Sequence, residues 1–213
     1  MINPIDTILS LALLSILFSF GSSRLPSLIK VLAFQGIVVC IVPLFIGHAM
    51  SGGNLAFVIA TLTIRGIVIP GCIYLAIKKV AIAREVEPIV GYHASIFCGL
   101  LLIVGATMAS RHFDIAYSSL SDLLLPTAIA LLGAGMFLLM ARRNAIAMVL
   151  GYMMMENGIY LVGTTFSIRA RHIVEFGILL DILAGVMIMA VILQNMKQTF
   201  DDVDTARLRT LKE

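Results

Sequence analysis

Apolar runs of about 20 residues follow one another along the chain, and short polar segments separate them. A segment of this length crosses a bilayer only as a helix or as part of a closed barrel, because backbone N–H and C=O groups find no water there. The alternating apolar and polar residues typical of barrel strands are absent from the sequence. The chain is 60% hydrophobic and 13% charged, whereas a soluble domain has roughly 25% charged residues. The sequence therefore predicts an all-α integral membrane protein.

We place seven transmembrane helices, at 5–21, 28–48, 54–78, 91–110, 120–141, 144–166 and 172–197. The loops on one side of the membrane carry eleven basic residues, namely Arg24, Lys30, Lys78, Lys79, Arg84, Arg142, Arg143, Lys197, Arg207, Arg209 and Lys212. The loops on the other side carry only Arg111, Arg169 and Arg171. The positive-inside rule then predicts an N-terminus outside and a cytoplasmic C-terminus. The net charge of +3 reflects this topology and gives no reason to propose nucleic-acid binding.

A short internal repeat indicates how the helices are grouped. Arg24 and the segment 31–34 match Arg142 and the segment 149–152 at a constant offset of 118 residues. Two three-helix units with the same orientation would then be joined by one helix, as in a 3+1+3 duplication. We divide the chain into an N-terminal four-helix membrane unit at 1–110, a three-helix unit at 111–197 and a cytoplasmic tail at 198–213.

One carboxylate lies near the middle of an apolar helix. Glu156 follows Arg143 by 13 residues, which in a helix is roughly 20 Å, or near the midplane of a bilayer core roughly 30 Å thick. A carboxylate at that depth is unfavourable and usually faces a bundle interior or an ion path. Tyr152 and Tyr160 lie one turn on either side, and Asn157 is adjacent, so these polar groups could hydrogen-bond the carboxyl.

A second acid lies on the next helix. Asp181 is flanked at spacing four by Gly177 and Gly185, which let another helix approach closely. The short connection to the helix at 144–166 would bring Asp181 towards Glu156. Burial and a neighbouring acid both disfavour a charged carboxylate, whereas a nearby cation favours it. Two such acids on adjacent helices indicate proton handling, and the alternative is that they are neutral or paired groups that only hold helices together.

The first three helices carry polar residues of their own. Arg65 lies near the middle of the helix at 54–78, where it is either the static ion-pair partner of a buried acid or a fixed charge that tunes it. The sequence leaves open whether Glu156 or Asp181 is that acid. Gln35 lies on the preceding helix, and Ser15 on the first, where we interpret its hydroxyl as a helix-packing group. Pro43 and Pro70 are expected to bend their helices.

The sequence contains no motif for a catalytic or cofactor site. There is no glycine-rich phosphate loop, nucleophile elbow or H-E-x-x-H motif. Cys40, Cys72 and Cys98 occur singly in apolar segments and cannot build an iron–sulfur or zinc site alone. We therefore expect no catalytic residue, metal or cofactor in this chain, and any redox centres belong to partner subunits.

The last three helices contain a set of residues that resembles a known family: Arg143-Asn144, Leu150-Gly151, Met154, Glu156-Asn157 and Asp181-x-x-x-Gly185. With these residues, the segment 120–200 resembles the K subunit of respiratory complex I and the C subunit of Mrp-type cation/proton antiporters. The seven-helix plan, the stretch Gly-Tyr-Met-Met-Met-Glu-Asn-Gly at 151–158, Arg65 and the tail resemble component E of hydrogenase-four-type formate hydrogenlyases.

This resemblance implies a multi-pass, non-catalytic subunit of a redox-driven oxidoreductase complex in the prokaryotic inner membrane, with protons or sodium ions as the translocated ion. By position, Glu156 is the central glutamate, and Arg65 is the basic residue of the hydrogenase type. Asp181 takes the place of a second acid that is usually Glu. The implied partners are lipid, antiporter-like and complex I H-type membrane subunits, and a cytoplasmic redox arm with nickel–iron (NiFe) and iron–sulfur centres. The alternatives are a purely structural linker between the antiporter-like subunits and the redox arm, and a free-standing small-solute carrier.

Overall fold

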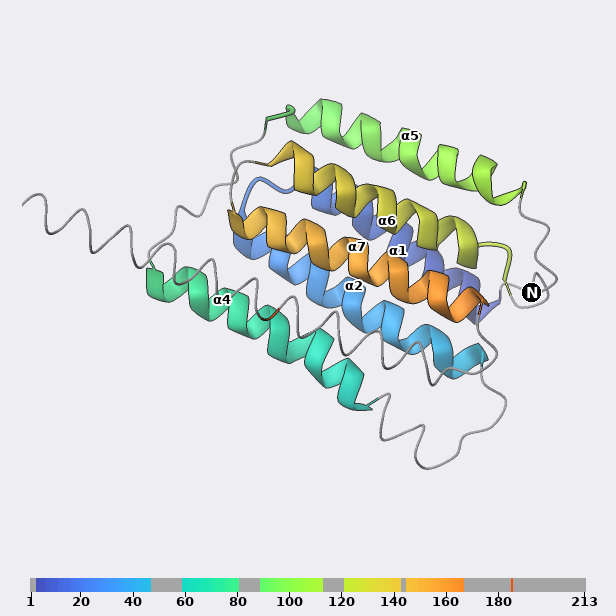
Figure 1. Ribbon diagram of the computed structural model, residues 1–213, viewed down its shortest axis with the longest axis horizontal. Coiled ribbons are helices and arrows are strands. Elements are labelled where there is room, and N and C mark those ends of the chain that lie inside the picture. Colours follow the sequence, from blue (N-terminus) through green and yellow to red (C-terminus); the bar gives the residue numbers. More distant parts are fainter. Residues whose placement is uncertain are drawn as a thin grey trace, which may run out of the picture.

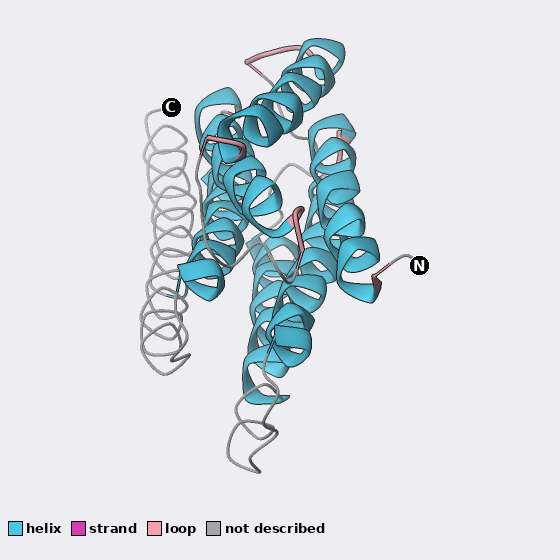
Figure 2. Cartoon of the chain, turned by 90° about the vertical axis from the view of Figure 1, so that its right-hand side faces the viewer, coloured by secondary structure: helices cyan, strands magenta, loops and turns pink. Residues whose placement is uncertain are grey.

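The structure is a computed structural model that describes residues 3–46, 59–80, 89–112, 121–142, 145–166 and Gly185. Within these ranges all regular elements are helices, and Figure 2 shows no strand among them. The elements are α1 (Pro4–Gly21), α2 (Leu25–Ile46), η1 (Ile64–Val68), α4 (Ile69–Val80), α5 (Tyr92–Ser110), α6 (Leu124–Ala141) and α7 (Ala145–Phe166). Residues 59–63 are also helical and lead directly into η1.

Five of the described helices are long and apolar enough to cross a membrane: α1, α2, α5, α6 and α7. Their bounds lie within a few residues of those predicted, so the all-α class is confirmed for the described part of the chain. The third predicted helix corresponds to the continuous helical segment 59–80. The seventh predicted helix, with Asp181, and the tail at 198–213 lie outside the described residues, so seven spans, the orientation and the three-unit division remain predictions.

Helix α7 lies at the centre of the bundle, between α6 and α2 (Figure 1). Helix α1 packs against α2, α5 and α6, while α5 and α4 lie at the two margins. The buried apolar side chains of α1, α2, α6 and α7 form one core cluster. Helix α6 contacts α7, α5 and α1 and is therefore a packing helix.

Glycines bring α6 and α7 into close contact. A Cβ atom added at Gly158 would lie 2.6 Å from Leu132 N and 2.9 Å from Ala128 O, and one added at Gly135 would collide with the backbone of Met155. Both neighbours are backbone atoms, which cannot turn aside as a side chain can. The absence of a side chain at these positions therefore sets how closely the two helices approach.

Arg142 joins the end of α6 to the ends of α1 and α5. Its Nη2 donates to Phe20 O at 3.1 Å, and its Cζ lies 5.2 Å from the Tyr92 ring centroid. Phe20 is in the last turn of α1, where carbonyl groups lack helical partners and a cation is favourable. Burial lowers the pKa of Arg142 from its usual value, while Tyr92 acts in the opposite direction. Arg142 thus supplies a donor to one of the last carbonyl groups of α1.

Candidate functional site

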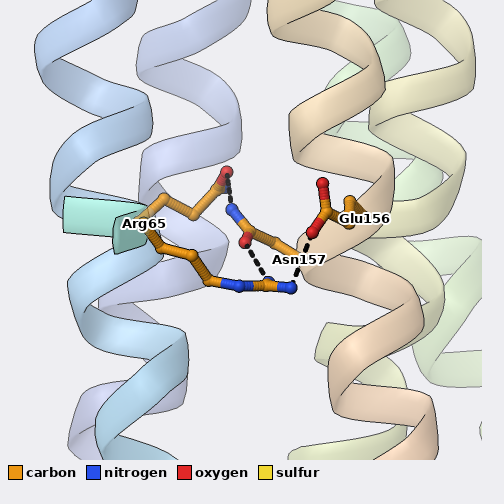
Figure 3. Close-up of polar contacts among 4 residues, drawn as sticks. Arg65, Glu156 and Asn157 are labelled. Carbon is orange, nitrogen blue, oxygen red and sulfur yellow. Dashed lines mark hydrogen bonds and ion pairs between the residues drawn. The ribbon is translucent and has the colours of Figure 1, made fainter. Parts of the chain in front are cut away.

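A buried ion pair joins two of the residues that the sequence indicated. Arg65 Nη2 lies 2.6 Å from Glu156 Oε1, and each side chain is only 3% exposed. Arg65 Nη1 also donates to Asn157 Oδ1 at 3.3 Å, so the guanidinium binds two consecutive residues of α7 (Figure 3). The question of which acid faces Arg65 is answered for the described residues: it pairs with Glu156.

Arg65 lies in a local distortion of its helix. Residues Ile64–Val68 form a π-helical turn, in which the N–H of Ile69 donates to the C=O of Ile64, five residues earlier. Pro70 follows directly and has no N–H, so the carbonyl of Gly66 loses its usual α-helical donor. A wider turn at this point is a known way to accommodate such a loss, and π-turns are frequent at functional sites. At the point where Pro70 predicted a bend, the helix therefore has a π-turn that carries Arg65.

Two glycines bring the backbone of this turn against α2. A Cβ added at Gly36 would lie 3.2 Å from Arg65 O, and one added at Gly66 would lie 2.8 Å from Ile37 Cγ1. Helix α2 therefore approaches η1 directly at Arg65. This close approach sets the position of the Arg65 backbone, from which the side chain extends.

The polar contacts continue from Asn157 across the bundle. Asn157 Nδ2 donates to Gln35 Oε1 at 3.4 Å, and Gln35 Nε2 donates to Ser15 Oγ at 2.8 Å. Ser15 Oγ in turn donates to Ala12 O at 2.5 Å, within α1. The series Arg65, Asn157, Gln35 and Ser15, here called the amide chain, thus connects η1, α7, α2 and α1.

The remaining predicted site residues differ in how far the structure describes them. Tyr160 is buried, and its ring centroid lies 4.9 Å from the Cζ atom of Arg65, an aromatic contact with the cation. Tyr152 is also buried, one turn before Glu156 on α7. Asp181 lies outside the described residues, so its predicted approach to Glu156 stays a prediction.

Sequence reasoning missed the part that Ser15 plays, because it interpreted this hydroxyl as a helix-packing group. Three serines occur on α1, and their spacing alone does not distinguish Ser15 from Ser10 or Ser19. The hydrogen bond from Gln35, on the neighbouring helix, is what distinguishes Ser15 from the other two serines. Among the described residues, no group of three or more His, Cys, Asp or Glu side chains could hold a metal ion.

Part of this site lies in a segment that matches the model of a known protein family. Residues 123–213 match the family model of NADH-ubiquinone/plastoquinone oxidoreductase chain 4L. The predicted resemblance is confirmed. The chain 4L-like region contains α6 and α7, and therefore Glu156 and Asn157, whereas Arg65, Gln35 and Ser15 precede it. The ion pair thus joins the chain 4L-like region to the N-terminal helices.

Two further relatives extend this resemblance. Over 78 residues the chain is 32% identical to hydrogenase-4 component E of Escherichia coli, a match that covers 37% of this chain and 36% of that protein. Over 195 residues it is 28% identical to the uncharacterized protein Rv0085 of Mycobacterium tuberculosis, which covers 89% of this chain and 87% of that protein. No solved structure matches the chain. With five long apolar helices among its described residues and these relatives, the chain is a multi-pass protein of a prokaryotic inner membrane.

Proposed function

We propose that this chain is a non-catalytic membrane subunit of a complex I-like or hydrogenase-like assembly, and that it takes part in translocating protons or sodium ions. The observation that carries the proposal is the buried Arg65–Glu156 pair, whose acid lies within the chain 4L-like region. The proposed partners are antiporter-like and H-type membrane subunits and a cytoplasmic redox arm. The nickel–iron and iron–sulfur centres of that arm would supply the electron transfer that drives translocation.

In this proposal Glu156 is the group that takes up and releases the ion. A proton on Glu156 removes the negative member of a buried pair that faces the guanidinium of Arg65, which is strongly unfavourable. Loading therefore requires a compensating charge close to Arg65. Asp181, on the helix predicted at 172–197, is the proposed second acid and the next step of the relay. Tyr152 and Tyr160 are proposed to support the pair as polar groups on the same helix.

The rival function is a structural linker, in which the pair only holds helices together. The close, fully buried contact between Arg65 and Glu156 also fits a static pair. A relay needs Glu156 to change its protonation state, whereas a linker needs Glu156 only to hold Arg65 by its charge and its hydrogen bonds. The two functions therefore differ in what happens when Glu156 can no longer ionise.

Glu156→Gln is expected to abolish ion translocation by the complexes that assemble, because Gln keeps size and hydrogen bonding but cannot ionise. Fewer complexes are expected to assemble, because Gln also removes the charge that faces the buried Arg65. The measurement is ion uptake per redox turnover by the intact complex in sealed vesicles. Met153→Leu, a change between two apolar residues on the same helix, is the matched control and should pump like the wild type. Unchanged pumping by Glu156→Gln at equal assembly would rule out the relay and leave the linker function.

A further inference from the structure

We propose that Asn157, Gln35 and Ser15 are positioning residues, which hold the guanidinium of Arg65 on Glu156 and do not themselves carry the translocated ion. This inference rests on the proposed function, since Arg65 and Glu156 form its central pair. Each member of the amide chain is at most 5% exposed. The successive hydrogen bonds are 3.3 Å, 3.4 Å and 2.8 Å long, from Arg65 through Asn157 and Gln35 to Ser15.

The direction of every hydrogen bond in the amide chain follows from Arg65. A guanidinium only donates, so the carbonyl oxygen of Asn157 must face it. The NH2 group of Asn157 then points to Gln35 and donates to its carbonyl oxygen, and the NH2 group of Gln35 donates to the Ser15 hydroxyl. If Asn157 were flipped, its NH2 group would face the guanidinium and its oxygen would face the oxygen of Gln35. If Gln35 were flipped, its NH2 group would face the NH2 group of Asn157, so that two donors would meet. The positive charge therefore fixes the orientation of both amides.

The chemistry of the amide chain makes it unsuited to carrying a proton. Proton transfer in proteins uses groups that gain and lose a proton readily, such as His, Asp, Glu, Lys, Tyr and Cys. The side-chain amides of Asn157 and Gln35 do neither near neutral pH, and both lie between Arg65 and Ser15. If Glu156 relays protons, the next group of the relay must therefore lie outside the amide chain.

The amide chain ends on the backbone of α1, which anchors it. Ser15 donates to Ala12 O, a backbone atom within α1, so the series ends on a rigid element. Arg65 is thereby connected to α7 directly and to α2 and α1 through two amides. These connections restrict rotation of the guanidinium and keep Nη2 on the carboxylate. Gln35 is connected to Arg65 through Asn157, so we assign it a positioning role.

A spectroscopic test detects this restriction without any transport assay. The method is ¹⁵N nuclear magnetic resonance of native membranes that contain the full chain labelled with ¹⁵N-arginine. The side-chain signals of Arg65 are identified by their loss in Arg65→Lys. We expect separate Nη signals in the wild type, because the guanidinium is held, and averaged signals in Gln35→Leu. Ser10→Ala is the control on α1: its exposed hydroxyl donates to Thr7 O within the same helix, so the spectrum of this variant should equal that of the wild type.

Pumping per redox turnover in sealed vesicles gives the second readout. Gln35→Leu has nearly the same volume but no hydrogen bonds, and we expect about tenfold less pumping at equal assembly, the effect of losing hydrogen bonding next to a charged group. Gln35→Glu, in its neutral form, keeps an acceptor for Asn157 and a donor for Ser15 and should restore most of the activity. Ser15→Ala, at the far end, should lower pumping by about twofold or less.

These variants distinguish a positioning role from simple space-filling and from ion conduction along the amide chain. If Gln35 only filled space, Gln35→Leu would pump normally and keep separate Arg65 signals, and the inference would be wrong. If the amide chain were the ion path, Ser15→Ala would stop pumping as completely as Gln35→Leu, which would also overturn it. Should Glu156→Gln pump normally, the proposed function fails, and the Arg65 signals in Gln35→Leu still decide whether the amide chain positions the guanidinium.

Discussion

Replacing Arg65 by Met is expected to lower the free energy of unfolding of this chain by about 3 to 5 kcal/mol, because it leaves the buried Glu156 carboxylate without its ion-pair partner. Both side chains are 3% exposed, so water cannot take over the role of the guanidinium. The measurement is thermal unfolding of the purified chain in mild detergent, together with its level in the membrane. We expect a lower unfolding temperature and a reduced level.

The double variant Arg65→Met/Glu156→Met is the matched control. Replacing a buried ion pair by apolar residues of similar volume is often neutral or stabilising, so this variant should regain the stability of the wild type. Under the proposed function it should still fail to pump. This result would distinguish the contribution of the pair to stability from its role in ion translocation. If Arg65→Met alone were as stable as the wild type, Glu156 would not depend on Arg65 for its place in the bundle.

Gly158→Ala is expected to destabilise the contact between α6 and α7 by about 1 to 3 kcal/mol, the usual effect of forcing extra atoms into a packed interior. The added Cβ would lie 2.6 Å from Leu132 N, a backbone atom, so the two helices must move apart. Asn157 is the adjacent residue and would move with α7. Thermal unfolding in detergent measures the loss.

Gly105→Ala on α5 provides the comparison, because a Cβ at Gly105 meets no atom within 4 Å. Alanine also has a higher helix propensity than glycine, so this variant should be at least as stable as the wild type. Equal unfolding temperatures for the two variants would show that the close approach of α6 and α7 is not needed for stability.

The residues of the ion pair could be found from sequence because each is unfavourable in an apolar helix. Glu156 and Arg65 are charged groups where a bilayer offers no water, so each must have a partner or a function. The length of the apolar runs also predicted the described helices to within a few residues, since a span must match the thickness of the membrane. These inferences depend only on local sequence.

What the sequence could not predict depends on contacts between distant helices. The choice of Glu156 as the partner of Arg65 follows from packing, in which Gly36 and Gly66 bring η1 against α2. The role of Ser15 depends on which face of α1 meets Gln35, and the three serines of that helix look alike in the sequence. The π-turn at Ile64–Val68 was not predicted either, because Pro70 alone indicates a bend and not how the backbone absorbs it.

The ion pair and the amide chain join residues that the ribosome synthesises far apart in time. Glu156 is synthesised 91 residues after Arg65, and Asn157 122 residues after Gln35. At about 5 to 20 residues per second, the ribosome needs roughly 5 to 18 s to reach Glu156 after Arg65. During that time the segment 59–80 has an arginine that opposes membrane insertion by roughly 2.5 to 3.5 kcal/mol at a helix centre, and the carboxylate that will neutralise it does not yet exist. The early helices are thus completed as a bundle only by the arrival of α7, the last helix that the structure describes in full.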